Sequence, residues 1–169
     1  MTEFDGAPKV IFSHGKESGP WGTKIQRLAK VAESLGFSVE SVDYTGLDDP
    51  GARVEKLLQQ LDATPPQLLV GSSMGGYVSA AAATKIPTRA LFLMAPAVFV
   101  PGYDDTEIRD LACPITVVHG WRDDVIPVEC AWRFSMLHGA TLHVLDDDHR
   151  LVGSLDFVEK LFTDFLGST

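Results

Sequence analysis

The sequence contains no long apolar run. None of its apolar segments approaches the roughly 20 residues that a membrane-spanning helix needs, so we expect no membrane partner. The first ten residues, MTEFDGAPKV, lack a basic patch followed by an apolar stretch, and so give no sign of a secretory signal. A cytoplasmic location is therefore the default expectation.

Positive charge is also scarce. The chain has 14 Lys and Arg residues against 23 Asp and Glu, a net charge of −9, and the acidic residues are spread along its length. Such a balance repels the phosphates of nucleic acids, which are not expected as partners. The 169 residues suffice for one domain with a sizeable core, and no internal repeat is present. We therefore expect residues 1–169 to form a single domain.

Cysteine is nearly absent. Cys113 and Cys130 match no metal-ligand spacing and fall in separate predicted elements. In a reducing compartment they are expected to be buried small hydrophobes rather than a disulfide. No H-E-x-x-H or paired Cys/His motif occurs, so no metal is predicted.

Phosphate-binding loops are missing too. The glycines of residues 71–76 are not followed by a lysine, and the segment SHGKES (13–18) lacks the first glycine of a P-loop. The dinucleotide fingerprint G-x-G-x-x-G is absent from both loops. The sequence therefore predicts no nucleotide and no other cofactor.

What the chain does have is a regular alternation of apolar runs and amphipathic segments. Strands are expected at residues 9–15, 37–44, 66–72, 89–96, 114–120 and 140–147, and helices at 22–36, 49–62, 74–86, 128–139 and 153–167. Several strands are almost wholly apolar, as in a parallel sheet covered on both faces. This order predicts a three-layer α/β/α doubly wound domain with a mostly parallel sheet of about six strands. Ligands of such sheets bind beyond the carboxyl ends of the strands.

One of these strand ends carries a candidate nucleophile. Residues 71–75, GSSMG, satisfy G-x-S-x-G at a strand-to-helix turn. Glycines on either side remove steric collisions at such a sharp turn, and the helix that follows favours negative charge there. Ser73 is thus the candidate nucleophile, and the backbone N–H of Met74 a candidate oxyanion donor. The alternative is a serine- and glycine-rich turn that merely closes tightly, and Ser72 is a competing hydroxyl.

A nucleophilic serine needs a base, and the base needs an acid to orient it. In a fold of this kind the acid follows the serine along the chain and the histidine comes last. Asp123 and Asp124 follow the strand at 114–120, and His149 follows the last strand. We expect Asp146, Asp147 and Asp148 to be solvated turn residues. The other histidines are expected to shape turns (His14 and His119), to act as a cation at a helix C-terminus (His138) and to pack in or on a strand (His143).

The pattern H-G-x-x-D-x-x-x-P at residues 119–127, the histidine after an Asp-rich turn, and Ser73 together resemble the α/β-hydrolase superfamily, in particular small bacterial serine esterases without a cap domain. The resemblance implies Asp123 as the acid, with Asp124 as the second choice, and His149 as the general base. The segment FSHGKE (12–17) is similar to the family's His-Gly loop, which implies the Lys16 backbone N–H as the second oxyanion donor.

The link at residues 97–112 has room for a loop and one short helix, but for no cap. An open, shallow site is expected, which suits a short or accessible acyl group. Phe99, Val100 and Tyr103 could line an acyl pocket or simply pack the link onto the domain.

Further side chains lie near the motifs. Lys16, Arg122 and Arg150 could form a cationic rim for an anionic substrate, although surface charges need no ligand. Trp21 and Trp121 could wall the entrance, whereas Trp132 is expected in the core.

The combined expectation is a serine hydrolase, most simply a carboxylesterase, that acts on a small-molecule ester or thioester through an acyl-enzyme. A thioesterase or an amidase would use the same residues. A non-catalytic binding protein of the same fold is the rival interpretation. The sequence leaves the natural substrate and the oligomeric state open.

Overall fold

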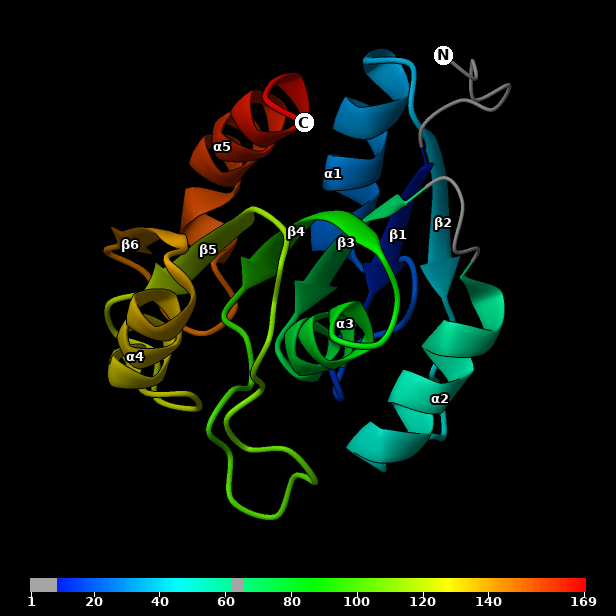
Figure 1. Cartoon of the computed structure of the whole chain (residues 1–169). Coiled ribbons are helices and arrows are strands. Elements are labelled where there is room, and N and C mark those ends of the chain that lie inside the picture. Colours follow the sequence, from blue (N-terminus) through cyan, green and yellow to red (C-terminus); the bar gives the residue numbers. More distant parts are fainter. Residues whose placement is uncertain (1–8, 62–65) are drawn as a thin grey trace.

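The computed structural model of the chain describes residues 9–61 and 66–169. Within them the chain forms a parallel sheet in the order β2-β1-β3-β4-β5-β6 (Figure 1). The strands are β1 (Lys9–Ser13), β2 (Ser38–Val42), β3 (Gln67–Ser72), β4 (Thr88–Met94), β5 (Ile115–Gly120) and β6 (Thr141–Leu145). The chain reverses direction across the sheet between β1 and β3, and the carboxyl ends of strands beside such a switch point bind ligands in folds of this type.

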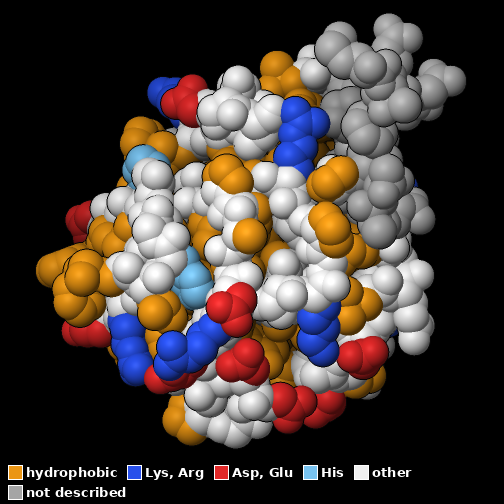
Figure 2. All heavy atoms as spheres, viewed as in Figure 1, with side chains coloured by type: hydrophobic (Ala, Val, Ile, Leu, Met, Phe, Trp, Pro, Cys, Tyr) orange, Lys and Arg blue, Asp and Glu red, His pale blue; other side chains and the backbone are white. Residues whose placement is uncertain are grey.

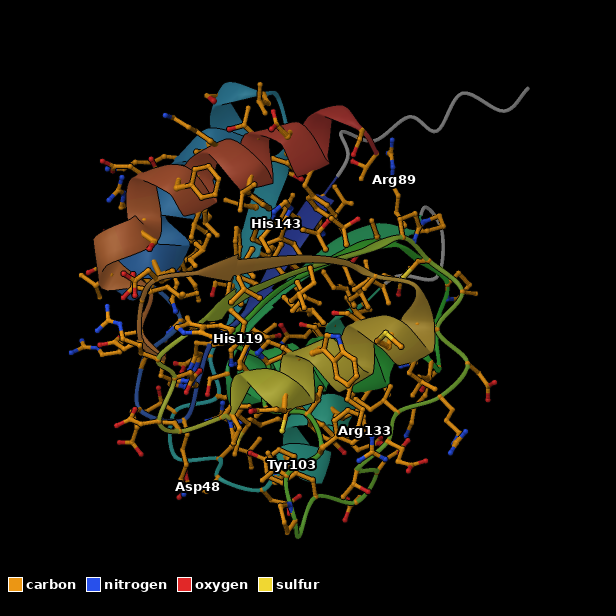
Figure 3. All side chains as sticks on the ribbon, turned by 90° about the vertical axis from the view of Figure 1, so that its left-hand side faces the viewer. Asp48, Arg89, Tyr103, His119, Arg133 and His143 are labelled. Atoms are coloured by element: carbon orange, nitrogen blue, oxygen red, sulfur yellow. The ribbon has the colours of Figure 1, made fainter. Side chains whose placement is uncertain are left out.

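Helices cover both faces of the sheet, which confirms the predicted three-layer α/β/α architecture. They are α1 (Thr23–Ser34), α2 (Pro50–Gln60), α3 (Met74–Ala83), α4 (Val128–His138) and α5 (Leu155–Gly167), with a short 3-10 turn at Val152–Ser154. Figure 3 shows the sheet close to edge-on, with α1 and α5 on one side and α3 and α4 on the other. The predicted end of the second helix at Asp62, like the first eight residues, lies outside the described residues.

Alternate residues of the strands fill two separate cores. In β1, Val10 and Phe12 pack with α1 and α5, whereas Ile11 packs with α2 and α3. Phe92 of β4 continues the first core, with its ring centroid 5.0 Å from that of Phe162 in α5. Because side chains point alternately to the two faces of a strand, a strand covered on both faces has to be apolar throughout.

Local signals fix the helix ends as expected. The Asp49 side chain accepts a hydrogen bond from the Ala52 N–H at 2.7 Å and caps α2, whose first residue is Pro50. Gly36 has φ +88°, and the next residue, Phe37, donates its N–H to the Ala32 carbonyl at 3.0 Å. These are the contacts of a glycine-terminated helix end.

One expectation about packing is wrong. Trp132 is 57% exposed instead of lying in the core, because α4 turns Ala131, Phe134 and Ser135 inward and so directs position 132 outward. The link at residues 97–112, although wholly described, contains no helix. Cys113 and Cys130 are free thiols. Both are half-buried and pack against the core that lies between the sheet and helices α2, α3 and α4 (the α2–α4 core).

In Figure 2 most acidic and basic side chains of the face shown lie along its lower part, where the two kinds are intermingled. Among the described helices, none has both the length and the apolar character that a membrane crossing requires.

Candidate active site

The turn between β3 and α3 holds Ser73 in an unusual backbone conformation, with φ 55° and ψ −121°. A non-glycine residue in this region is strained by about 1–3 kcal/mol. The glycines around it are required by close packing. A Cβ atom on Gly71 would lie 2.2 Å from the Gly75 carbonyl oxygen, and one on Gly75 would lie 2.0 Å from the Ser13 carbonyl oxygen. The glycines of the G-x-S-x-G pattern therefore allow the turn to pack closely against the end of β1. The Ser73 side chain remains partly exposed.

Ser73, His149 and Asp123 form a continuous hydrogen-bonded line. The His149 Nε2 atom lies 3.0 Å from Ser73 Oγ, and its Nδ1 atom lies 2.7 Å from Asp123 Oδ2. The three residues follow β3, β5 and β6, so parallel strands bring them to one edge of the sheet. Because a carboxylate can only accept, the proton of a neutral His149 sits on Nδ1, and Nε2 is free to accept the serine proton.

The Asp123 carboxylate is held on both oxygens. Its side chain is fully buried, and Oδ1 accepts the backbone N–H groups of Val125 and Ile126 at 2.9 and 2.8 Å. Asp124 is exposed, and its carboxylate makes no hydrogen bond within the described part of the chain. The geometry therefore places Asp123, and not the second choice Asp124, beside His149.

His119 also reaches this carboxylate, a contact that sequence reasoning missed. Its Nε2 atom lies 2.8 Å from the Ile126 carbonyl oxygen and 3.1 Å from Asp123 Oδ2. Both neighbours are acceptors, so Nε2 carries the proton. Burial lowers the pKa of His119, so the ring is neutral. Figure 3 shows His119 on β5. Its spacing of four residues from Asp123 in the H-G-x-x-D pattern is the signal that could have revealed the contact.

The two expected oxyanion donors belong to the two segments that border the serine, the loop after β1 and the first turn of α3. A Cβ atom on Gly15 would be 3.3 Å from Ser73 Cβ, so the loop after β1 runs against the nucleophile. The Lys16 N–H has no acceptor among the described residues. The Met74 N–H is the first of α3, where backbone donors have no partner within the helix. The assignment of these two N–H groups as oxyanion donors stays a prediction.

Residues 9–108 match the model of an uncharacterised protein family, UPF0227. The chain belongs to the UPF0227 family and is an α/β hydrolase by fold. A solved structure from Xanthomonas campestris pv. campestris, described as a hydrolase of the alpha/beta superfamily, is 35% identical with a TM-score of 0.88, and the match covers 96% of this chain and 99% of that one.

Named relatives point in the same direction. Palmitoyl-protein thioesterase ABHD10, mitochondrial, from Pongo abelii is 31% identical over 77% of this chain and 60% of its own length. The matches to ABHD10 from four mammals span between 32% and 60% of those proteins. The structure of mouse alpha/beta hydrolase domain-containing protein 10 is 20% identical, with a TM-score of 0.77 and coverage of 96% of this chain and 91% of that one, and shows the shared fold. Together these relationships support a hydrolase.

The expected cationic rim of the UPF0227 chain is incomplete. The Arg122 guanidinium is bound to Asp146 at 2.9 Å, whereas the side chains of Lys16 and Arg150 are exposed. A lysine that sequence reasoning missed lies close by. Lys24 of α1 donates to the Arg150 carbonyl oxygen at 3.2 Å, and burial, followed by the charge of Arg150, lowers its pKa to about 8.

The aromatic residues of the link pack inward. Tyr103 meets Tyr77 of α3 edge-on at 4.8 Å, and the Arg133 guanidinium lies 4.1 Å from the centre of the Phe99 ring. Figure 3 shows Tyr103 and Arg133 on the α4 side of the sheet. Phe99, Val100 and Tyr103 are half-buried against the α2–α4 core, so they do pack the link onto the domain. A role for them in an acyl pocket stays a prediction.

Two tryptophans lie in loops that follow strands of the sheet near the candidate site. Trp21, in the loop after β1, is 45% exposed, and Trp121, directly after β5, is 65% exposed. Their exposure is compatible with a wall of the entrance, which stays a prediction.

Three further titratable residues, His14, His138 and Asp147, are buried to different degrees, and only His14 has the role expected from the sequence. His14 is buried and shapes its turn as expected, with Nε2 accepting the Tyr44 N–H at 2.9 Å. His138 is not a cation, because burial against Phe134 lowers its pKa. Asp147 is not a solvated turn residue, because its side chain is buried and accepts the Asp148 N–H at 2.8 Å.

The residues near the site do not form a metal centre. Within residues 9–61 and 66–169, no three His, Cys, Asp or Glu side chains are grouped as ligands of one ion. The chemistry that the arrangement offers is nucleophilic, through Ser73.

Proposed function

We propose that this UPF0227 protein is a serine hydrolase that cleaves a carboxylic ester through an acyl-enzyme. The observation that carries the proposal is the line of hydrogen bonds from Asp123 through His149 to Ser73, which ends at a strained, partly exposed serine. Strain at a nucleophile is retained in a folded protein only where the surrounding structure enforces it, here through Gly71 and Gly75.

The proposed reaction uses only side chains and backbone groups of the chain. Ser73 Oγ attacks the substrate carbonyl while its proton moves to His149 Nε2, and the imidazolium then protonates the leaving group. Asp123 fixes the imidazole and stabilises its positive charge. The N–H groups of Lys16 and Met74 hold the oxyanion, each contributing roughly 3–4 kcal/mol. Water repeats the cycle on the acyl-enzyme, so no cofactor is required.

The surroundings of Ser73 support a proposal for the substrate class. The link after β4 forms no cap, which favours a small molecule or an accessible acyl group. A thioester is the second candidate, because the curated relatives carry the name palmitoyl-protein thioesterase. Exposed Lys16 and Arg150 favour a substrate with negative charge near the scissile bond, whereas Arg122 is already paired with Asp146. The cytoplasmic location stays a prediction, and the names of those relatives call them mitochondrial.

A fluorophosphonate probe tests the proposal directly, because it reacts with activated serines. Wild-type protein should be labelled at Ser73, and Ser73→Ala should not be labelled. Ser72→Ala is the matched control, since it removes the adjacent hydroxyl and leaves the His149 contact intact. Equal labelling of wild type and Ser73→Ala, or no labelling of either, would favour the non-catalytic binding protein.

A substrate panel then separates the two ester classes. Nitrophenyl esters of increasing chain length should be compared with acyl thioesters of the same chains. Faster turnover of the thioesters at matched chain length would replace the carboxylesterase assignment with a thioesterase. For the charge preference, Lys16→Met and Arg150→Met should lower the rate on an anionic ester more than on a neutral one. Equal losses on both esters would remove that preference.

A further inference from the structure

A buried arginine lies beneath the loop that runs against Ser73. Arg53 of α2 is 1% exposed, and within the described residues no carboxylate is close enough to form an ion pair with it. Its guanidinium donates instead to backbone carbonyls, through Nε to Leu47 at 2.6 Å and through Nη1 to His14 at 3.0 Å and Gly15 at 3.4 Å. Burial of a cation without a counter-ion is costly, and an apolar residue here would avoid that cost.

The contact between Arg53 and the Gly15 carbonyl also affects the N–H at the other end of that peptide group. The Gly15 carbonyl and the Lys16 N–H belong to one planar trans peptide group, so they point in opposite directions. Whatever fixes the carbonyl therefore also fixes the N–H. The Gly15 oxygen is bound from one side, by Arg53 Nη1 and by His14 Nδ1 at 2.7 Å. The N–H on the opposite side belongs to the loop that packs against Ser73.

His14 can donate to this carbonyl because its other nitrogen is already in use. His14 Nε2 accepts the Tyr44 N–H, so the proton of the neutral ring is on Nδ1. Burial lowers the pKa of His14 and keeps the ring neutral. Tyr44 closes the network, since its hydroxyl bonds Ser13 Oγ at 2.9 Å and its ring lies 5.0 Å from the Arg53 guanidinium carbon.

We propose that Arg53, together with His14, positions and polarises the Gly15–Lys16 peptide so that its N–H stabilises the oxyanion formed on Ser73. The inference rests on the proposed function. Hydrogen bonds to a carbonyl strengthen the donor at the other end of the same peptide, and the effect is larger when the hydrogen-bond donor is charged. Arg53 is a positioning residue, because it acts through the peptide and not on the substrate.

A direct contact between Arg53 and substrate is the competing role. It is disfavoured because Nε and Nη1 are both engaged with backbone carbonyls and the side chain is almost wholly inaccessible. The two roles differ in kinetics. Oxyanion stabilisation exists mainly in the transition state and changes kcat, whereas a ground-state contact changes KM.

The test compares Arg53→Met, Arg53→Lys and wild type with p-nitrophenyl acetate as substrate and phenylboronic acid as inhibitor. The boronic acid forms a tetrahedral anionic adduct on Ser73 and so probes the same N–H groups. In Arg53→Met we expect kcat to fall about 10- to 100-fold with KM within about twofold, and Ki for the boronic acid to rise in parallel. Arg53→Lys keeps the charge but not the planar fork, so its kcat should fall only about threefold.

Leu57→Ala is the matched control for lost stability. Leu57 is fully buried one turn further along α2, where its side chain is part of the apolar core. Its removal should lower the melting temperature but leave kcat and the boronic acid Ki within about twofold of wild type at temperatures where the protein is folded. If Arg53→Met does not fold, the same test is made with Arg53→Lys, for which an unchanged kcat contradicts the proposal.

The other outcomes of the Arg53→Met test separate the positioning role from a substrate contact and from a failure of the proposed function. A folded Arg53→Met with wild-type kcat and Ki overturns the positioning role, and a raised KM at unchanged kcat shows a substrate contact instead. Either result leaves the serine-hydrolase proposal intact if wild-type Ser73 still reacts with the fluorophosphonate. Absence of that labelling in wild type overturns both proposals.

Discussion

The Nε2 atom of His119 lies 3.1 Å from Oδ2 of Asp123, the same oxygen that accepts the Nδ1 proton of His149. The Asp123 carboxylate thus accepts two backbone N–H groups at Oδ1 and the His149 N–H at Oδ2, and the His119 ring lies beside Oδ2. A carboxylate bound in this way has little freedom to rotate, so it fixes the direction of the His149 ring.

His119→Phe keeps a ring in this position but removes the N–H. The buried Ile126 carbonyl then loses its donor and Asp123 loses the polar ring atom beside Oδ2, so the free energy of unfolding should fall by about 1–3 kcal/mol. The kcat for ester hydrolysis should fall less than about tenfold, because Asp123 keeps its contact with His149. Urea unfolding and p-nitrophenyl acetate turnover measure the two effects, with His143→Phe on β6 as control. A loss of kcat as large as that of Asp123→Asn would contradict a supporting role for His119.

Asp123 and Asp124 are adjacent, so the same substitution at Asp124 is the control for the substitution at Asp123. Asp123→Asn replaces the carboxylate that meets His149 with an amide and disturbs the tautomer of the ring, so kcat should fall by about 10³- to 10⁴-fold. Asp124→Asn changes an exposed side chain, and kcat should stay within about twofold of wild type. Steady-state kinetics on both variants decides between the carboxylates. The reverse ranking would show that the acid is Asp124.

The strained backbone at Ser73 predicts that activity and stability oppose each other there. Glycine adopts φ 55° without the strain of a side chain, so Ser73→Gly should be more stable than Ser73→Ala by about 1 kcal/mol or more. Both variants lack the hydroxyl and should be inactive. The matched change Ser72→Gly lies at the end of β3, outside the positive-φ positions of the described chain, and should cost about 0.5–1 kcal/mol. Urea unfolding of the variants tests the comparison, and a less stable Ser73→Gly would show that the turn is not strained.

Much of the fold could be predicted because its signals are local. Apolar strands, the Asp49–Pro50 helix start and the glycine after α1 each follow from a few neighbouring residues. Their alternation leads to the three-layer sheet, and strand order along the chain then brings Ser73, Asp123 and His149 to one edge. The site could be anticipated to that extent because parallel strands share one carboxyl edge.

The residues that were missed depend on contacts between distant segments. In the sequence Arg53 is one more charged residue on a helix, and only the approach of the loop after β1 shows that its guanidinium is buried. Asp147 is buried next to Gly153, whereas its neighbours Asp146 and Asp148 are exposed. The exposure of Trp132 differs from the expectation because a large aromatic side chain usually lies inside, whereas the direction of the helix face decides its burial.

The buried histidines should make the free energy of unfolding depend on pH. Burial lowers the pKa of His14, His119 and His138 below the ordinary value of 6.5, so these rings stay neutral in the folded protein when they would be protonated in the unfolded chain. Below pH 6.5 the unfolded state therefore binds more protons than the folded state, and the free energy of unfolding falls as the pH falls. The carboxyl groups with lowered pKa values, Asp43, Asp147 and Asp156, titrate below 3.8 and do not contribute in this range.

His138→Phe isolates one of these contributions away from the candidate site. His138 Nε2 is buried without a hydrogen-bond partner and the ring packs against Phe134, so phenylalanine should be accommodated near neutral pH. Because phenylalanine cannot take up a proton, the variant should lose less stability than wild type between about pH 7 and pH 5.5. Urea unfolding at several pH values within this window measures both slopes. An identical slope for the variant would mean that His138 does not resist protonation, and a wild-type stability that rises toward pH 5.5 would contradict the argument for all three rings.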